Sequence, residues 1–306
     1  MTISISVNQF SRSSLCNFLC SFLCSFSQIM LQRNAATGLL FIVSIGLNAP
    51  NMLIGAAIAV VSALLVAQFF QYDSDSINSG LYGFNAALVG SAVFLFLPAN
   101  VFSFTLVIIA GAISTVIMHF MLHFTSQRLP DFPVFTAPFL VSIWIILQLS
   151  EIQFIETIAI DVKTPSIITN ASSDLSIVIR GVGQVLFQGH WFSGIVCIAG
   201  LLLHSYKVAA WAIIGSVGGL IVARMFDFPE NLVHQGLYGF NASLTAIALT
   251  DRYPKKFFKT RWPVLLGIVI SVLLTRAFEY LTMPALTAPF VLASWLVIVL
   301  VKIESA

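Results

Sequence analysis

The chain has 306 residues, of which 58% are hydrophobic and only 8% are charged. Soluble domains carry about 25% charged residues, so this composition excludes a soluble globular protein and indicates a chain that lies in lipid. The net charge of +2 is too small to favour a nucleic-acid partner.

Apolar stretches follow one another along the whole chain. Some approach the roughly 20 residues that a helix needs to cross a bilayer, whereas others are shorter, interrupted by Gly or Pro, and indicate half-helices. They are continuously apolar rather than alternating, which disfavours a β-barrel. The stretches are residues 52–70, 86–97, 102–122, 134–149, 191–203, 208–222, 264–274 and 285–301. We therefore expect an all-α polytopic membrane protein.

The heptapeptide GLYGFNA occurs twice, at residues 80–86 and 236–242, with an offset of 156 residues (236 minus 80). An identity of this length is very unlikely by chance. It indicates that the chain is a duplication, and that the same special backbone site occurs once in each half.

Two further blocks recur in the same order. Gln28 precedes the first copy as Gln184 precedes the second. Downstream, PVFTAPF matches PALTAPF, and each block is followed five residues later by a tryptophan, Trp144 or Trp295. We therefore expect a first repeat over residues 14–150, a linker over 151–173, and a second repeat over 174–302.

The charges predict how the two repeats are oriented. Residues 251–261, after the second heptapeptide, hold five basic residues and one acid, and the positive-inside rule places such a loop in the cytoplasm. The corresponding loop of the first half, residues 97–103, has no charge. Equivalent loops on opposite sides require inverted repeats with an odd number of spans. We expect about five helices per repeat, with residues 38–70 forming either one broken span or two.

Few side chains in the apolar stretches could do chemistry. His119 and His123 share a helix face, but no third metal ligand or proton-relay partner is visible. Arg276 and Glu279, three residues apart, are expected to form a structural ion pair. Apolar packing is expected of the cysteines, Cys16, Cys20, Cys24 and Cys197. The sequence predicts no cofactor, no metal and no enzyme activity, and it lacks the intramembrane acids that a coupled pump uses.

The repeated blocks contain residues that interrupt helices. Gly83 and Gly239 are expected to let the backbone leave regular helix, with close helix packing as the alternative. Pro138 and Pro289 predict a half-helix end or a kink.

Thr136 and Thr287 supply hydroxyl groups at a shared depth. A hydroxyl can donate and accept a hydrogen bond, which suits a small polar solute. The alternative is that each hydroxyl bonds to its own helix backbone.

Together these doubled blocks resemble the urea transporter family over nearly the whole chain. The resemblance implies two inverted-topology repeats, re-entrant half-helices that form a central pore, and a homotrimer in which each protomer has its own pore. It also implies a narrow slot in which aromatic rings sandwich flat urea and oxygens accept its N–H groups.

The resemblance carries the family's pore residues to eight positions of this sequence. Glutamines are expected at the two pore sites, threonines at the centre and phenylalanines in the slot. Leu31 departs from the aromatic residue usual at its position, and Asn-Pro motifs common in the family are missing. The expected pore residues are Gln28, Leu31, Phe84, Thr136, Gln184, Phe187, Phe240 and Thr287.

The leading hypothesis is therefore a channel that lets urea cross passively and selectively. A channel for another small neutral solute, such as an acetamide-like amide or ammonia, is the alternative. A membrane enzyme or sensor using His119, His123 and His190 would need these side chains to converge. The expected location is the plasma membrane, specifically a bacterial cytoplasmic membrane, with lipid as partner.

Overall fold

The computed structural model describes residues 4–129, 132–149, 173–253, 261–281 and 283–305, with side chains from residue 15 onward. Helices are the only regular elements in these ranges, and no strand occurs among them. The prediction of an all-α fold is confirmed. Residues 151–172 of the expected linker and most of the basic loop over 251–261 lie outside the described residues.

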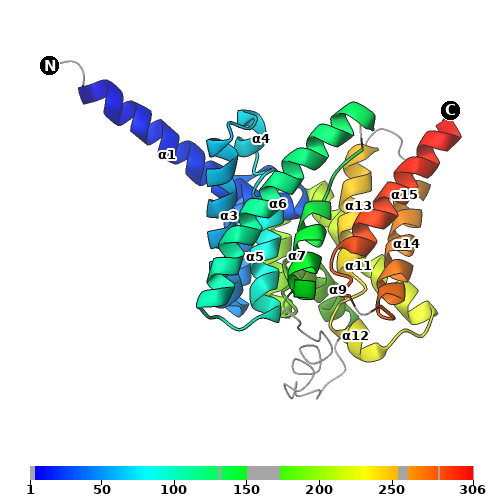
Figure 1. Cartoon of the computed structure of the whole chain (residues 1–306). Helices are drawn as coiled ribbons and strands as arrows, with labels where there is room; N and C mark the ends of the chain where they lie inside the picture. The colour runs from blue at the N-terminus through cyan, green and yellow to red at the C-terminus, as the bar shows by residue number, and fades with distance from the viewer. Residues whose placement is uncertain (1–3, 130–131, 150–172, 254–260, 282, 306) are drawn as a thin grey trace.

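The described helices form two series, and the helices within residues 35–96 have the same lengths, in the same order, as those within residues 191–252 (Figure 1). The first series is α1 (Ser4–Ser27), η1 (Gln28–Met30), α2 (Ala35–Asn48), α3 (Pro50–Phe69), α4 (Ser74–Asn78), α5 (Phe84–Phe96), α6 (Val101–Arg128) and α7 (Ala137–Leu149). The second is α9 (Asp174–Gly183), η2 (Gln184–Leu186), α10 (Trp191–His204), α11 (Tyr206–Met225), α12 (Glu230–His234), α13 (Phe240–Arg252), α14 (Trp262–Phe278) and α15 (Ala288–Ser305).

Three of the described helices, α3, α6 and α11, are long and apolar enough to cross a membrane. Two further apolar helix pairs are bent by 73° at a short break, one between α1 and α2 and the other between α9 and α10. Shorter apolar helices include α5, α7 and α14. The stretch over residues 38–70 forms two helices, α2 and α3, rather than one.

The backbone itself repeats. Eight described residues have positive φ, and they fall into four pairs, one member in each half: Leu31 and Phe187, Gln71 and Asp227, Gly80 and Gly236, Phe135 and Leu286. The spacing is 156 residues in the first three pairs (187 minus 31, for example) and 151 in the last (286 minus 135). Left-handed backbone is costly for residues other than glycine. Its recurrence at matched positions is strong physical support for a duplicated fold.

The glycines with left-handed backbone lie three residues before the glycines at which the sequence predicted irregular backbone. Gly83 and Gly239 have ordinary right-handed helical angles and immediately precede α5 and α13. Positive φ occurs at Gly80, where a Cβ atom would lie 2.4 Å from the backbone of Cys24. The irregular backbone expected at Gly83 is therefore at Gly80, whereas Gly83 allows close approach of Ser25.

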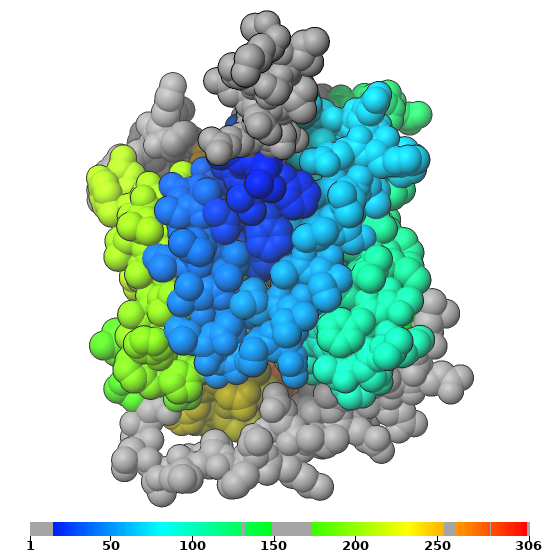
Figure 2. Space-filling view, turned by 90° about the vertical axis from the view of Figure 1, so that its left-hand side faces the viewer, coloured from blue at the N-terminus to red at the C-terminus, as the bar shows by residue number. Residues whose placement is uncertain are grey.

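The two halves pack side by side along α2 and α10. Figure 2 shows blue residues of the first half directly beside yellow-green residues of the second. Two buried hydroxyls bond across this contact: Thr37 Oγ1 donates to Gly200 O at 2.8 Å, and Ser44 Oγ to Ser193 O at 2.9 Å. The opposite half satisfies these buried polar atoms, and the larger of the two hydrophobic clusters contains residues of both halves.

Candidate functional site

Two buried threonine hydroxyls, one from each half, meet inside the molecule. The Oγ1 atoms of Thr136 and Thr287 lie 2.7 Å apart, and the two residues are only 1% and 2% exposed. Each threonine immediately precedes a helix, α7 or α15. The alternative in which each hydroxyl bonds to its own helix is therefore wrong, because each hydroxyl has the other as its partner.

The start of each helix explains why the threonine hydroxyl is available. A threonine just before a helix ordinarily accepts from the N–H of the second or third helical residue. Here the second residue is proline, Pro138 or Pro289, which has no N–H and is well tolerated at a helix start. Of the two predicted possibilities, a half-helix end and a kink, the structure shows the first. The prolines lie at the start of α7 and α15 and do not kink a longer helix.

Asparagines of the GLYGFN motif accept a hydrogen bond from the N–H group of the third residue of each helix. Asn85 Oδ1 accepts from Phe139 N at 3.2 Å, and Asn241 Oδ1 accepts from Phe290 N at 3.3 Å. Phe139 and Phe290 are the third residues of α7 and α15. A side chain from another helix therefore does the capping, and the threonine hydroxyl remains free to face the opposite half.

The same asparagines also bond to the residue that precedes each threonine. Asn85 Nδ2 donates to Phe135 O at 3.3 Å, and Asn241 Nδ2 donates to Leu286 O at 3.1 Å. Both asparagine side chains are fully buried. Sequence reasoning did not include them among the site residues, although their identical place in both heptapeptides was a usable signal.

Aromatic residues lie close to the two threonines in sequence, and two of their ring contacts cross between the halves. The rings of Phe135 and Phe290 lie 4.8 Å apart, and those of Phe139 and Phe187 lie 6.2 Å apart, each contact joining the two halves. Phe84 and Phe240 begin α5 and α13 and are 2% and 9% exposed. Phe135, Phe139 and Phe290 were not among the expected wall residues.

Gln28 and Gln184 open the short 3-10 turns at the two bends. Each turn ends at a residue in the left-handed conformation, Leu31 with φ 61° and Phe187 with φ 58°, whose N–H bonds to the glutamine carbonyl at 2.9 Å. All four side chains are partly buried. Gln184 Nε2 donates to Gln235 O at 3.0 Å, which fixes this amide beside the second heptapeptide.

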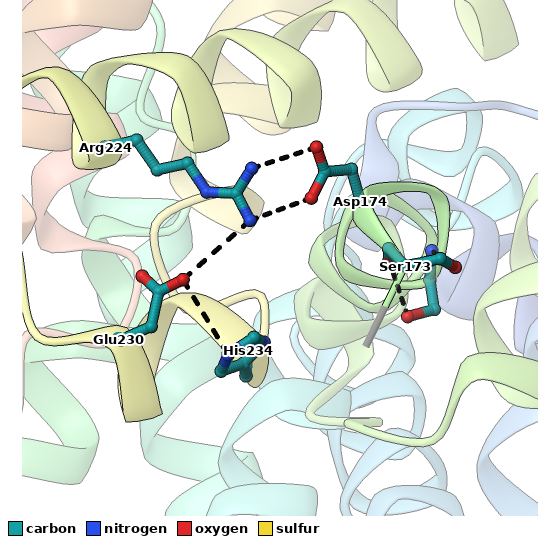
Figure 3. Close-up of polar contacts among 6 residues, drawn as sticks. Ser173, Asp174, Arg224, Glu230 and His234 are labelled. Atoms are coloured by element: carbon teal, nitrogen blue, oxygen red, sulfur yellow. Dashed lines mark hydrogen bonds and ion pairs between the residues drawn. The ribbon is translucent and has the colours of Figure 1, made fainter. Parts of the chain in front are cut away.

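A charged cluster lies at one end of the second half (Figure 3). Arg224 at the end of α11 makes a two-point ion pair with Asp174 at the start of α9, with contacts of 2.8 and 2.9 Å. Glu230 lies 3.8 Å from Arg224 and 3.7 Å from His234. These side chains are substantially exposed, so the cluster joins helix ends at the surface rather than entering the centre.

The histidines do not gather into a site. His119 Nδ1 lies 3.0 Å from Tyr82 Oη, and its ring stacks on Tyr72. His123 bonds to Gln127 along α6, whereas His190 caps α10. Within the described ranges, no three His, Cys, Asp or Glu side chains are grouped to hold a metal ion.

Arg276 and Glu279 form the expected ion pair, and Glu279 also accepts from Tyr238 Oη. This prediction is confirmed. The pair links the end of α14 to Tyr238 of the second heptapeptide.

Bent apolar helix pairs in both halves and a buried contact between two hydroxyls define a multi-pass helical membrane protein of transporter type. The sequence profile of the urea transporter family matches residues 19–302, and the chain therefore belongs to that family.

Relatives from mammals extend over most of the chain. Urea transporter 1 of Ovis aries is 26% identical over 296 residues, which cover 90% of this chain and 74% of the relative. Urea transporter 1 of Mus musculus is 27% identical over 305 residues, which cover 92% of this chain and 77% of the relative.

Proposed function

We propose that this protein is a channel-type urea transporter that lets urea cross a membrane passively through a pore in each protomer. The buried contact between Thr136 and Thr287 is the observation that carries the proposal. It lies where two half-helices from opposite halves begin, and family membership and the names of the relatives support urea as the solute.

The chemistry of the hydroxyl pair suits urea. Urea presents N–H donors along its edges and a carbonyl acceptor at one end, and each hydroxyl can donate as well as accept. A urea molecule at this depth replaces the bond between Thr136 and Thr287 by bonds to both. An unpaired polar group in a buried site costs about 1–3 kcal/mol. Because urea replaces the lost hydroxyl bond, neither hydroxyl is left unpaired, and the free-energy barrier to urea permeation stays low.

The surrounding side chains supply shape and further polar contacts. Phe84 and Phe240 are proposed as slot walls, with Leu31 and Phe187 beside the glutamines. Gln28 and Gln184 are proposed to bind urea on either side of the centre, where their amides can replace part of its hydration. Flat rings then favour a flat solute over a bulky one.

Passive movement is supported by the kind of side chain that is buried. Among the described residues, the buried polar side chains are Ser, Thr, Asn and Gln, and no Asp, Glu, Lys or Arg is buried. Proton- or ion-coupled transport uses ionisable groups within the membrane. A neutral hydrogen-bonding path needs none.

The arrangement in the membrane is part of the same proposal. Residues 14–150 and 174–302 are two inverted repeats of about five helices each, joined by a linker over 151–173. The protein is a homotrimer in a plasma membrane, specifically a bacterial cytoplasmic membrane. The matched pairs of positive-φ residues support the repeat, and the basic residues of 251–261 support the orientation.

Urea flux into proteoliposomes tests the function. We expect the wild-type protein to raise urea permeability well above that of empty vesicles, and we expect Thr136→Val and Gln184→Ala to lower it. Valine matches threonine in shape and lacks only the hydroxyl. Equal fluxes through all three proteins would contradict the assignment.

Competition between solutes tests the choice of substrate. Acetamide shares one amide with urea, and ammonia has no planar face for the rings to cover. We expect urea to be the preferred solute, with weaker inhibition of its flux by acetamide. Faster permeation of acetamide or ammonia than of urea would favour a channel for that solute instead.

A further inference from the structure

The two tryptophans that follow the TAPF blocks bond across the molecule in a reciprocal way. Trp144 Nε1 donates to Pro284 O at 3.0 Å, and Trp295 Nε1 donates to Pro133 O at 2.8 Å. Trp144 belongs to α7 in the first half and Trp295 to α15 in the second. Each half therefore holds the other through the same residue type, and we name this pair of bonds the tryptophan clasp.

The clasp acts directly on the segments that carry the threonines. Pro133 lies three residues before Thr136, and Pro284 lies three residues before Thr287. Each tryptophan thus fixes the segment that leads into the threonine of the opposite half. Each bond joins a tryptophan that follows one threonine to the proline carbonyl that precedes the other threonine. Both bonds therefore connect α7 and its preceding segment with α15 and its preceding segment.

Ring contacts reinforce both bonds across the halves. The Trp144 ring is nearly parallel to that of Phe278, with centroids 6.4 Å apart and an interplanar angle of 18°. The Trp295 ring lies 5.6 Å from Phe132. A partly buried indole N–H needs an acceptor, but a carbonyl of its own half would satisfy that need. Both indoles instead use a carbonyl of the opposite half.

We propose that Trp144 and Trp295 are positioning residues that set the separation of α7 and α15, and hence the size of the solute that passes Thr136 and Thr287. This inference rests on the proposed function. A narrow site discriminates by size only if its two walls are held at a fixed distance. Without the clasp, the segments that carry the threonines are joined across the halves by the hydroxyl contact, which the solute must replace, and by the ring contact between Phe135 and Phe290.

Selectivity measurements test the proposal. The variants are Trp144→Phe, Trp295→Phe and the double variant, which keep a ring but lose the N–H donor. The control is Trp191→Phe, because Trp191 is 46% exposed and lies outside the clasp. Permeabilities to urea and to N-methylurea, which is larger by one methyl group, are measured in proteoliposomes.

We expect each clasp variant to lower the ratio of urea to N-methylurea permeability by about three- to tenfold, the effect of losing one hydrogen bond. The two single variants should behave alike because their bonds are reciprocal, and the control should keep the wild-type ratio. Folded clasp variants with an unchanged ratio would overturn the proposal. So would failure of both single variants to fold, since the clasp would then be a requirement for folding alone.

A measurement without solute separates this inference from the proposed function. Thr136→Cys and Thr287→Cys are combined, diamide is added as the oxidant, and the rate of disulfide formation between the two cysteines is followed by mass spectrometry. We expect this rate to fall several-fold when Trp144→Phe is added and to stay unchanged with Trp191→Phe. A wild-type protein that passes no urea would defeat the proposed function, whereas an unchanged cross-linking rate would defeat the clasp.

Discussion

Replacing Asn85 by alanine should both destabilise the protein and close the threonine site. The substitution removes two hydrogen bonds to the backbone, of 3.2 and 3.3 Å, and a weak one to Met118 Sδ, from a fully buried side chain. It leaves Phe139 N–H and Phe135 C=O without these partners, at about 2 kcal/mol each and about 4 kcal/mol together. Thr136 can then rotate to cap α7, which recovers about 1 kcal/mol. The expected net loss is about 3 kcal/mol.

The rotation of the hydroxyl gives this prediction a specific signature. In the wild-type protein Thr136 bonds to Thr287 and does not cap its own helix. In the Asn85→Ala protein it becomes the cap, so that adding Thr136→Val should cost about 1 kcal/mol more stability there than in the wild type. Urea flux should show the opposite pattern: Thr136→Val lowers it in the wild type and has no further effect after Asn85→Ala.

The double-mutant cycle consists of the wild type, Asn85→Ala, Thr136→Val and the double variant. Circular dichroism during thermal unfolding in detergent gives the stability of each protein, and urea flux is measured on the same proteins in proteoliposomes. Ser142→Ala is a matched control, because Ser142 Oγ is buried but bonds only to Pro138 O within α7 at 2.8 Å. The control should change stability by less than about 1 kcal/mol and leave flux unchanged. Equal stability costs of Thr136→Val in both backgrounds would refute the capping argument.

Three other substitutions have definite expected outcomes. Gly90→Ala should destabilise by about 1–3 kcal/mol in thermal unfolding, because its Cβ would lie 2.3 Å from Gly55 O and overpacks two backbones; an unchanged midpoint would contradict this. Arg224→Gln should lower the unfolding midpoint only slightly, since its pairing with Asp174 is exposed, and the loss should shrink in high salt. Leu31→Phe should fold and reduce N-methylurea permeability more than urea permeability, and the reverse order would remove Leu31 from the slot.

The broad architecture could be predicted because its causes are local or compositional. Continuous apolar stretches with few charges require helices in lipid, where every backbone group must be satisfied within its own segment. The doubled blocks identified the two halves, and proline at the second helical position explains why Pro138 and Pro289 begin half-helices. The ion pair between Arg276 and Glu279 was also predictable, since helical spacing brings them together.

The irregular backbone was predicted less well. The left-handed conformation falls at Gly80 and Gly236, and also at residues such as Leu31 and Phe135 that carry no sequence signal for it. Residues other than glycine adopt this conformation only where surrounding contacts compensate its cost. Local propensity therefore could not reveal these positions.

By itself the sequence determined that this is a helical membrane protein with doubled blocks, and it left open whether the prolines of the TAPF blocks begin helices or kink them. Tertiary structure alone decided what the threonines of those blocks and their neighbours touch. Thr136 meets Thr287 across 151 residues, and Trp144 reaches Pro284 across 140. Asn85 caps a helix that lies 54 residues further along the chain. A hydrogen bond between distant residues depends on how whole helices pack, and no local pattern of residues encodes its partner.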